Sequence, residues 1–283
     1  GKKIGLMGAA ISDYPEIDEL CRSILGEGLS MSVASFRADS VTKELVEALA
    51  ASGLQTLTLA PEAGSARMRA VINKGIEEHH LFTAIDLGAA AHIPNFKLYI
   101  MVGLPFEEDA DIAAIIDLAE RLRRYMDERG SRGTLTLSVN PFVPKPFTPF
   151  QWMPMASKKR LDAVMKTLTQ ALRRTKKIVV NFESPKEALV QAILARGDRR
   201  LSLPLMRAAA GQRISCPRCG TQVSLPTTIS RANGRRMRCS RGSISIWALR
   251  SAICGRNTSG QSRSRRRLAA LTAARVAASA ERT

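Results

Sequence analysis

The sequence lacks the signals that mark several classes of protein. None of its apolar runs approaches the roughly 20 residues that a membrane-spanning helix needs. The first residues, Gly1-Lys2-Lys3-Ile4, do not contain the hydrophobic region of a secretory signal peptide. Five cysteines in 283 residues do not form the pattern of a secreted disulfide framework. We therefore expect a cytoplasmic protein that makes no contact with a membrane.

Common catalytic and nucleotide-binding signals are also missing. The chain contains three histidines, and its polar strand ends include neither a Ser-His-Asp arrangement nor a cluster of metal-binding side chains. No Gly-x-Gly-x-x-Gly follows an expected strand, and no phosphate-loop pattern occurs. Hydrolysis by a nucleophilic triad and nucleotide binding on an open sheet are therefore disfavoured.

Charge is distributed unevenly along the chain. The net charge is +18, but residues 201–283 contain 16 arginines, no lysine and one acidic residue, Glu281. The other 200 residues contain 27 basic and 24 acidic side chains, a net charge of +3. The first 200 residues are therefore nearly balanced in charge, and the basicity belongs to the C-terminal segment.

What the sequence does contain is a repeated strand–helix pattern. Cys21 lies on the apolar face of the first helix and is expected in the core. Pro61, which has no N–H to donate, is expected to end the third strand. The alternation predicts an α/β fold with a parallel sheet, and the missing glycine motif favours a barrel or part of one. The first expected strand, residues 3–10, should be buried. The other expected strands are residues 29–36, 56–60, 96–102 and 134–140.

Polar side chains collect where these strands end. Loops that follow parallel strands converge at the carboxyl edge of the sheet, which is where ligands bind in α/β proteins. A carboxylate there can accept both hydroxyls of a ribose, and a guanidinium can pair with a ligand carboxylate. For each residue alone, the alternative is a helix cap. The set comprises Ser12, Asp13, Ser35, Arg37, Glu62, Ser65, Glu107, Asn140 and Lys145.

Four ordered motifs give these strand ends a family resemblance. They are Ala60-Pro61-Glu62-Ala63-Gly64-Ser65, Ile72-Asn73-Lys74-Gly75, Gly103-Leu104-Pro105-Phe106-Glu107 and Pro144-Lys145-Pro146-Phe147-Thr148-Pro149. With this spacing, residues 1–203 resemble the radical S-adenosylmethionine (radical SAM) enzymes, most closely the branch with an upstream cobalamin (B12)-binding domain. The resemblance implies strands two to six of a partial (β/α)6, TIM-like barrel in residues 1–155 and a helical C-terminal extension in residues 156–203.

The resemblance also implies roles for particular residues. Glu62 and Ser65 would contact the ribose of S-adenosylmethionine. Arg37 is a candidate for the methionine carboxylate, with Ser35 on the same strand end. The backbone of Val102 and Gly103 would meet the adenine. The family further implies a [4Fe–4S] cluster, possible use of cobalamin, and an electron donor such as flavodoxin or ferredoxin. The intact enzyme would cleave the cofactor reductively to a 5′-deoxyadenosyl radical, while its catalytic residues and substrate are not assigned.

One family motif is absent. The sequence contains no Cys-x-x-x-Cys-x-x-Cys, the loop whose three thiolates hold the iron–sulfur cluster in this family. Cys21, alone on a helix, cannot replace it. We expect this loop upstream of Gly1, so that the chain is a fragment that by itself neither ligates the cluster nor cleaves the cofactor.

The C-terminal segment allows other interpretations. Cys216 and Cys219 have the spacing of a zinc knuckle, and the arginines could bind phosphates, which together suggest a non-enzymatic nucleic-acid-binding protein. A metal-independent barrel enzyme is a third possibility. Arginine without lysine, beside many Ser and Ala, is also what GC-rich DNA yields in the wrong reading frame. We therefore expect residues 204–283 to follow a frameshift and to be disordered.

Overall fold

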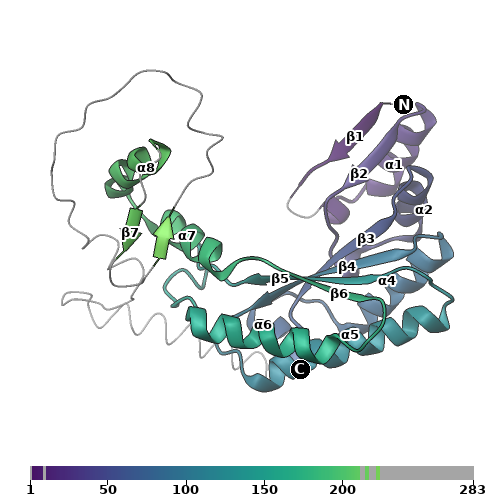
Figure 1. The fold of residues 1–283 in the computed structure, drawn as a ribbon. Helices are drawn as coiled ribbons and strands as arrows, with labels where there is room; N and C mark the ends of the chain where they lie inside the picture. The colour runs from purple at the N-terminus through teal and green to yellow at the C-terminus, as the bar shows by residue number, and fades with distance from the viewer. Residues whose placement is uncertain (1, 9–10, 211–213, 217–220, 224–283) are drawn as a thin grey trace. The chain divides into compact units, whose positions relative to one another are not determined.

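The computed structural model describes residues 2–8, 11–210, 214–216 and 221–223 of the chain. These residues form two compact units (Figure 1). The first unit contains residues 2–8, 11–141 and 159–183, and the second contains residues 142–158 together with the described residues from 184 onward. The predicted boundaries at residues 155 and 203 stay predictions, although the second of them falls inside a helix, α8 (Ser202–Ala209).

The first unit is built from parallel strands joined by helices, as the alternating sequence predicts. Two strands, β1 and β2, pair in parallel, and four more form a parallel sheet in the order β3-β4-β5-β6. A bridge between Phe36 and Leu59 joins the chain after β2 to β3. The α/β class with parallel sheets is therefore confirmed, while the (β/α)6 barrel stays a prediction. The strands are β1 (Lys3–Leu6), β2 (Ser30–Val33), β3 (Thr56–Glu62), β4 (Asn95–Val102), β5 (Leu135–Pro141) and β6 (Ile178–Phe182).

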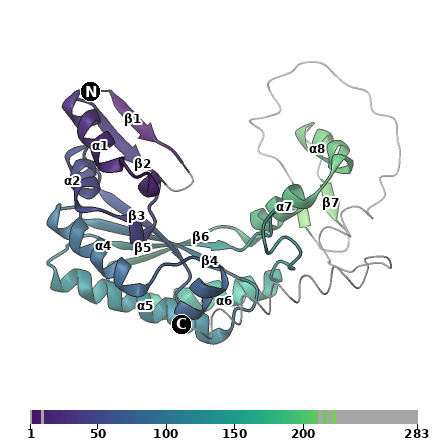
Figure 2. The same cartoon turned by 180° about the vertical axis from the view of Figure 1, so that it is seen from behind.

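Helices cover one face of the four-stranded sheet. Figures 1 and 2 show α4, α5 and α6 along the same side of β3–β6. Strand residues alternate in burial, and Phe96, Leu98 and Ile100 of β4 are at most 1% exposed. The residues between them are half-buried. The helices of this unit are α1 (Ile17–Gly26), α2 (Lys43–Ala51), α3 (Ala66–Val71), α4 (Glu78–Ala90), α5 (Asp109–Glu128) and α6 (Lys158–Leu172), with short 3-10 turns η1 (Ile11–Asp13) and η2 (Ala38–Ser40).

Two local expectations were wrong, and one was confirmed. Strand β3 does not end at Pro61 but continues to Glu62 through a bulge, because one extra residue between Leu59 and Glu62 removes the need for a ladder N–H at the proline. Strand β1 is largely exposed rather than buried, since its side chains find little cover among the described residues. Cys21 is fully buried on α1, as expected.

The described part of the second unit contains an irregular segment, residues 142–157, followed by helices. It contains α7 (Pro185–Arg196), η3 (Arg199–Leu201) and α8, followed by two short antiparallel strands, β7 (Ile214–Cys216) and β8 (Thr221–Val223). The predicted zinc pair falls outside the described residues, because Cys219 and the side chain of Cys216 are not described. Disorder was predicted for residues 204–283. Of these, residues 204–209 belong to α8, and residues 214–216 and 221–223 form β7 and β8, whereas 211–213, 217–220 and 224–283 lie outside the described residues. Within the described residues no helix is long and apolar enough to cross a membrane.

Candidate functional site

Glu62 has an unusual backbone at the carboxyl end of β3. Its φ of +66° lies in the left-handed region, which costs a residue other than glycine about 1–2 kcal/mol. Such conformations persist where surrounding contacts impose them, and they are frequent at ligand-binding sites. The Glu62 carboxylate is half-buried, and burial raises its pKa, while Lys74, whose Nζ lies 3.3 Å from Oε1, opposes that rise. The bulge and its strain therefore present one carboxylate at the strand end.

The contacts that hold this backbone come from a buried arginine. Arg69 on α3 is 3% exposed, and its guanidinium donates to the carbonyls of Ala63 (3.2 Å), Gly64 (2.9 Å) and Ile76 (2.8 Å). Burial lowers the pKa of Arg69. Because a guanidinium is planar and keeps its charge in proteins, this clamp fixes the two residues after Glu62 relative to α3.

Ser65 begins α3 as its N-cap. Its hydroxyl accepts a hydrogen bond from the backbone N–H of Met68 (3.0 Å) and donates to Oδ1 of Asp111 on α5 (2.7 Å). Asp111 also accepts from the guanidinium of Arg67 and from the N–H of Glu108. Burial alone would raise the pKa of Asp111, but the hydrogen bonds from Arg67 and Ser65 outweigh it and lower the pKa. Ser65 therefore caps a helix and joins it to α5.

The predicted residues that follow β2 lie beside the loop of Lys74. The Arg37 guanidinium makes a two-point contact with Asp39 (3.1 and 2.6 Å) and donates to the carbonyl of Lys74 (3.2 Å). These bonds use Nε and Nη2, and Nη1 makes no hydrogen bond to another described residue. Ser35 lies half-buried in the segment between β2 and this arginine. The structure thus links Arg37 to Glu62 through Lys74.

The turn after β4 closes on its own carboxylate. Gly103 has a φ of +75°, and its N–H donates to Oε2 of Glu107 (2.8 Å). Burial raises the pKa of Glu107, while bonds from the N–H groups of Gly103 and Leu104 oppose that rise. Val102, the last residue of β4, is fully buried. The N–H of Gly103 is therefore already paired within the turn.

The strand ends of β3 and β4 are joined to each other. Arg67, which binds Asp111, also donates through Nη2 to the carbonyl of Phe106 (2.9 Å) in the turn after β4. Phe106 is a further non-glycine residue with positive φ, at +66°. Sequence reasoning missed Arg67, Arg69 and Asp111, because helical charged residues usually face solvent and their partners lie in other elements. Sequence reasoning did predict that Glu62, Ser65 and Gly103 lie at the carboxyl edge of the sheet, where the structure has them.

Residues that could hold an iron–sulfur cluster are not found in the described part of the chain. No group of three or more His, Cys, Asp or Glu side chains there has the arrangement of a metal site. Cys21, the free cysteine among the described residues, is fully buried, and burial raises the pKa of its thiol. The described residues therefore do not fit a cluster, whereas the carboxylate and backbone groups at the strand ends fit a polar organic cofactor.

Comparisons with known proteins bear on the same residues. The Radical SAM superfamily model matches residues 1–119, which include the ends of β2, β3 and β4. An uncharacterized protein of Methanocaldococcus jannaschii is 37% identical over 202 residues, 71% of this chain. The chain spans 42% of that relative's length.

Two solved structures show weak similarity to this chain. Streptococcus suis SuiB is 12% identical, with a TM-score of 0.43, and the match covers 64% of this chain and 39% of SuiB. A sugar phosphate isomerase/epimerase from Parabacteroides distasonis is 13% identical, with a TM-score of 0.33, and the match covers 69% of this chain and 75% of that protein.

Proposed function

We propose that this chain carries the S-adenosylmethionine-binding part of a radical SAM enzyme, with Glu62 as the residue that binds the ribose. The observation that carries the proposal is the half-buried Glu62 carboxylate, held in a strained backbone at a strand end inside the matched residues. A carboxylate accepts from both hydroxyls of a vicinal diol, and such bonds to a charged acceptor are the stronger kind. In the whole enzyme, one electron from the iron–sulfur cluster would cleave the bound cofactor to methionine and a 5′-deoxyadenosyl radical.

The neighbouring residues take supporting roles in this proposal. Lys74, whose ammonium lies 3.3 Å from the carboxylate, favours the ionised form of Glu62 and opposes the rise in its pKa that burial causes. Arg37 has Nη1 available for the methionine carboxylate, while its other nitrogens fix the loop of Lys74. Ser65 positions the loop through its cap. The backbone of Val102 and Gly103 would meet the adenine through groups other than the Gly103 N–H, which already donates to Glu107. Ser35 borders the same end of β2.

A cluster, an electron donor and cobalamin would be features of the whole protein rather than of this chain alone. The 283 residues contain no three-cysteine loop, so we place the cluster ligands outside this sequence and propose that the chain alone binds the cofactor without cleaving it. Use of cobalamin and reduction by a flavodoxin or ferredoxin remain predictions from the family resemblance. The nucleic-acid-binding alternative rests on Cys216, Cys219 and C-terminal arginines whose side chains are not described, apart from Arg207.

Isothermal titration of the chain with S-adenosylmethionine tests the ribose role of Glu62. We expect measurable binding that Glu62→Gln weakens at least about tenfold, because losing a hydrogen bond to a charged group costs about 1.5–3 kcal/mol. Glu47→Gln is the matched control. Glu47 is 57% exposed on α2, and its ion pair is with Lys43 of the same helix rather than with a strand-end residue. Equal affinity of Glu62→Gln and the unmodified chain, or no binding by either, would overturn the proposal.

A further inference from the structure

The structure buries one positive charge of α3 without pairing it to a carboxylate. Arg69 is 3% exposed, and its three hydrogen bonds within the described residues all end on backbone carbonyls. The carboxylate whose charge acts on it is that of Glu78, which already makes a two-point contact with Arg121 on α5. Burying a charge without a counter-ion is costly, and an apolar side chain of similar volume is often at least as stable. Stability alone therefore does not explain an arginine at this position.

The carbonyls that Arg69 binds belong to two different loops. Its Nη1 donates to Ala63 and Gly64, the first two residues after Glu62. Its Nε donates to Ile76, in the loop that joins α3 to α4. Because the nitrogens of a guanidinium are held in one plane, the two loops cannot shift relative to each other without breaking one of these bonds. Arg69 therefore ties the loop of Glu62 to the loop before α4.

The loop before α4 carries the cationic partner of Glu62. Lys74 lies in this loop, and its Nζ is 3.3 Å from Oε1 of Glu62. The backbone N–H of Lys74 donates to the carbonyl of Arg69 (2.8 Å), so the same arginine also holds Lys74 by its main chain. Asn73, the residue before it, has a φ of +52°, a conformation that persists where surrounding contacts impose it. The position of the Lys74 ammonium relative to the Glu62 carboxylate therefore depends on the contacts of Arg69.

We infer that Arg69 is a positioning residue for cofactor binding, which ties the two loops so that the Glu62 carboxylate is oriented to accept both ribose hydroxyls. The inference rests on the proposed function, because that function gives the ribose to Glu62. Arg69 is buried and its Nε and Nη1 are committed to carbonyls, so it acts through Glu62 and does not touch the cofactor. A hydrogen bond weakens steeply as its angle departs from linearity, so a rotation of the carboxylate lowers the affinity.

A double-mutant cycle, measured by isothermal titration of the chain with S-adenosylmethionine, tests this inference. Arg69→Lys keeps the charge but ends in a single ammonium, which cannot replace bonds from two separate nitrogens of a guanidinium. It should weaken binding about tenfold, as the loss of a hydrogen bond to a charged group does. In a chain that already carries Glu62→Gln, Arg69→Lys should weaken binding by no more than about twofold, because residues that act through one interaction are not additive.

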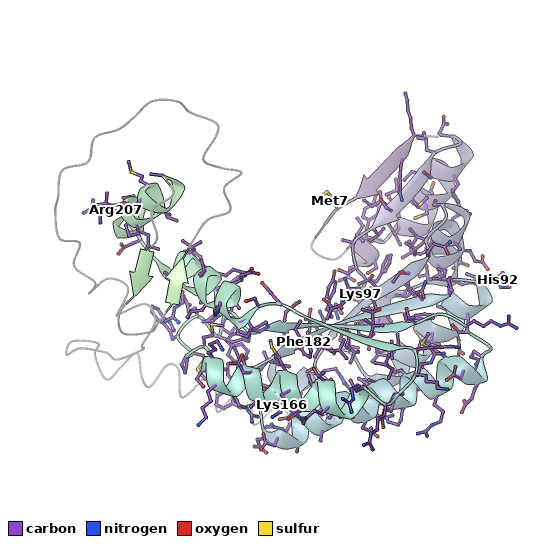
Figure 3. The ribbon with its side chains drawn as sticks, viewed as in Figure 1. Met7, His92, Lys97, Lys166, Phe182 and Arg207 are labelled. Atoms are coloured by element: carbon purple, nitrogen blue, oxygen red, sulfur yellow. The ribbon has the colours of Figure 1, made fainter. Side chains whose placement is uncertain are left out.

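Arg123→Lys is the matched control for Arg69→Lys. Arg123 on α5 is the other buried arginine of the described residues, and it too donates to backbone carbonyls, among them that of Gly133 (2.8 Å). This carbonyl precedes β5, at the amino edge of the sheet. In Figure 3, His92 before β4 marks that edge, and Phe182 at the end of β6 marks the carboxyl edge. Arg123→Lys should therefore lower stability in urea unfolding as Arg69→Lys does, but leave the affinity for the cofactor unchanged.

The outcomes separate failure of this inference from failure of the proposed function. Unchanged affinity of Arg69→Lys, losses that multiply in the double variant, or an equal loss for Arg123→Lys would overturn the inference while leaving the role of Glu62 intact. Unchanged affinity of Glu62→Gln would overturn the proposed function and the inference with it. Arg69→Gln, which keeps two N–H donors, replaces the lysine variant if that variant does not fold. Unfolding of both while Arg123→Lys stays folded would also overturn the inference, because Arg69 would then serve the fold alone.

Discussion

Asp111 is the residue on which the two neighbouring strand-end loops meet. It accepts bonds from Ser65 after β3, from Arg67 and from the N–H of Glu108, and Arg67 extends the contact to the turn after β4. Asp111 is 5% exposed, so these bonds replace water that the carboxylate has lost. A buried acceptor with several donors is costly to remove, because each donor is then left without a partner.

We expect Asp111→Asn to lower the free energy of unfolding at pH 7 by about 2 kcal/mol, the cost of losing charge-assisted bonds at a buried site. The pKa of Asp111 in the folded chain lies below its ordinary value of 3.8, so its contribution to stability is present above that value. The contribution is lost as the pH falls through the folded pKa. Urea unfolding at a series of pH values should therefore show the difference between the two proteins shrinking below about pH 4.

Asp117→Asn is the matched control for this prediction. Asp117 lies on the same helix and pairs with Arg121, but its side chain is 64% exposed, and such surface pairs contribute roughly 0.3–0.5 kcal/mol. A loss for Asp111→Asn as small as that for Asp117→Asn, or one that does not change with pH, would contradict the role given to Asp111.

Individual residues show where prediction from sequence succeeds and where it ends. Glu62 was placed at the strand end because alternation and the following helix locate that end. The strain at Glu62 could not be predicted, since it comes from a bulge around Pro61 and from the clamp of Arg69. Asp111 was missed because its partner Ser65 lies 46 residues away, and no local pattern connects the two.

At the scale of elements, a glycine sets how closely the β3–α3 loop approaches α5. A Cβ placed on Gly64 would lie 2.5 Å from the backbone N of Ile115 and 2.6 Å from its Cα. Backbone atoms in mid-helix cannot move aside without breaking hydrogen bonds, so the loop or the helix would have to shift. That close approach is what brings Ser65 within reach of Asp111.

Gly64→Ala should therefore destabilise the chain by about 2–3 kcal/mol, the range for overpacking a well-packed site. It should also weaken S-adenosylmethionine binding, because the loop that carries Glu62 is displaced. Urea unfolding followed by circular dichroism and isothermal titration measure the two effects. Gly26→Ala is the control, since a Cβ there meets nothing within 4 Å and alanine favours the helix by about 0.5–1 kcal/mol. Equal stability of the two variants would show that the loop is not held against α5.

Strands and helices were the part of the fold that the sequence predicted best. Each of the five expected strands occurs, because apolar alternation and flanking glycines are local signals. The burial of β1 was predicted wrongly, since an apolar run shows that a strand could be buried but does not supply the element that covers it. The same alternation predicts a polar face around Lys97. Which polar residues lie beside one another on that face could be known only from the register of β3, β4 and β5.

For the whole molecule, two classes of function are assigned to different parts of the chain. The cofactor proposal uses residues between Ser35 and Glu107, within the residues that the superfamily model matches. The nucleic-acid alternative uses the C-terminal segment, where residues 211–283 contain 15 arginines against one glutamate. Removing that segment lowers the net charge from +18 to +4 while leaving every residue of the strand ends in place. A single truncation therefore separates the two functions.

We expect residues 1–210 to bind S-adenosylmethionine as the full chain does and to lose any affinity for duplex DNA. Binding by arginines alone is electrostatic, so for the full chain it should fall about a thousandfold between 50 and 200 mM salt and show no preference for sequence. Titration with the cofactor and fluorescence anisotropy with labelled DNA measure the two activities, with circular dichroism to check that the truncated chain folds. Cofactor binding that disappears with the C-terminal segment would contradict the site at Glu62. DNA binding that survives the truncation at 200 mM salt would mean that residues 1–210 themselves hold a nucleic-acid site, because the charge that remains is too small to act through counterion release alone.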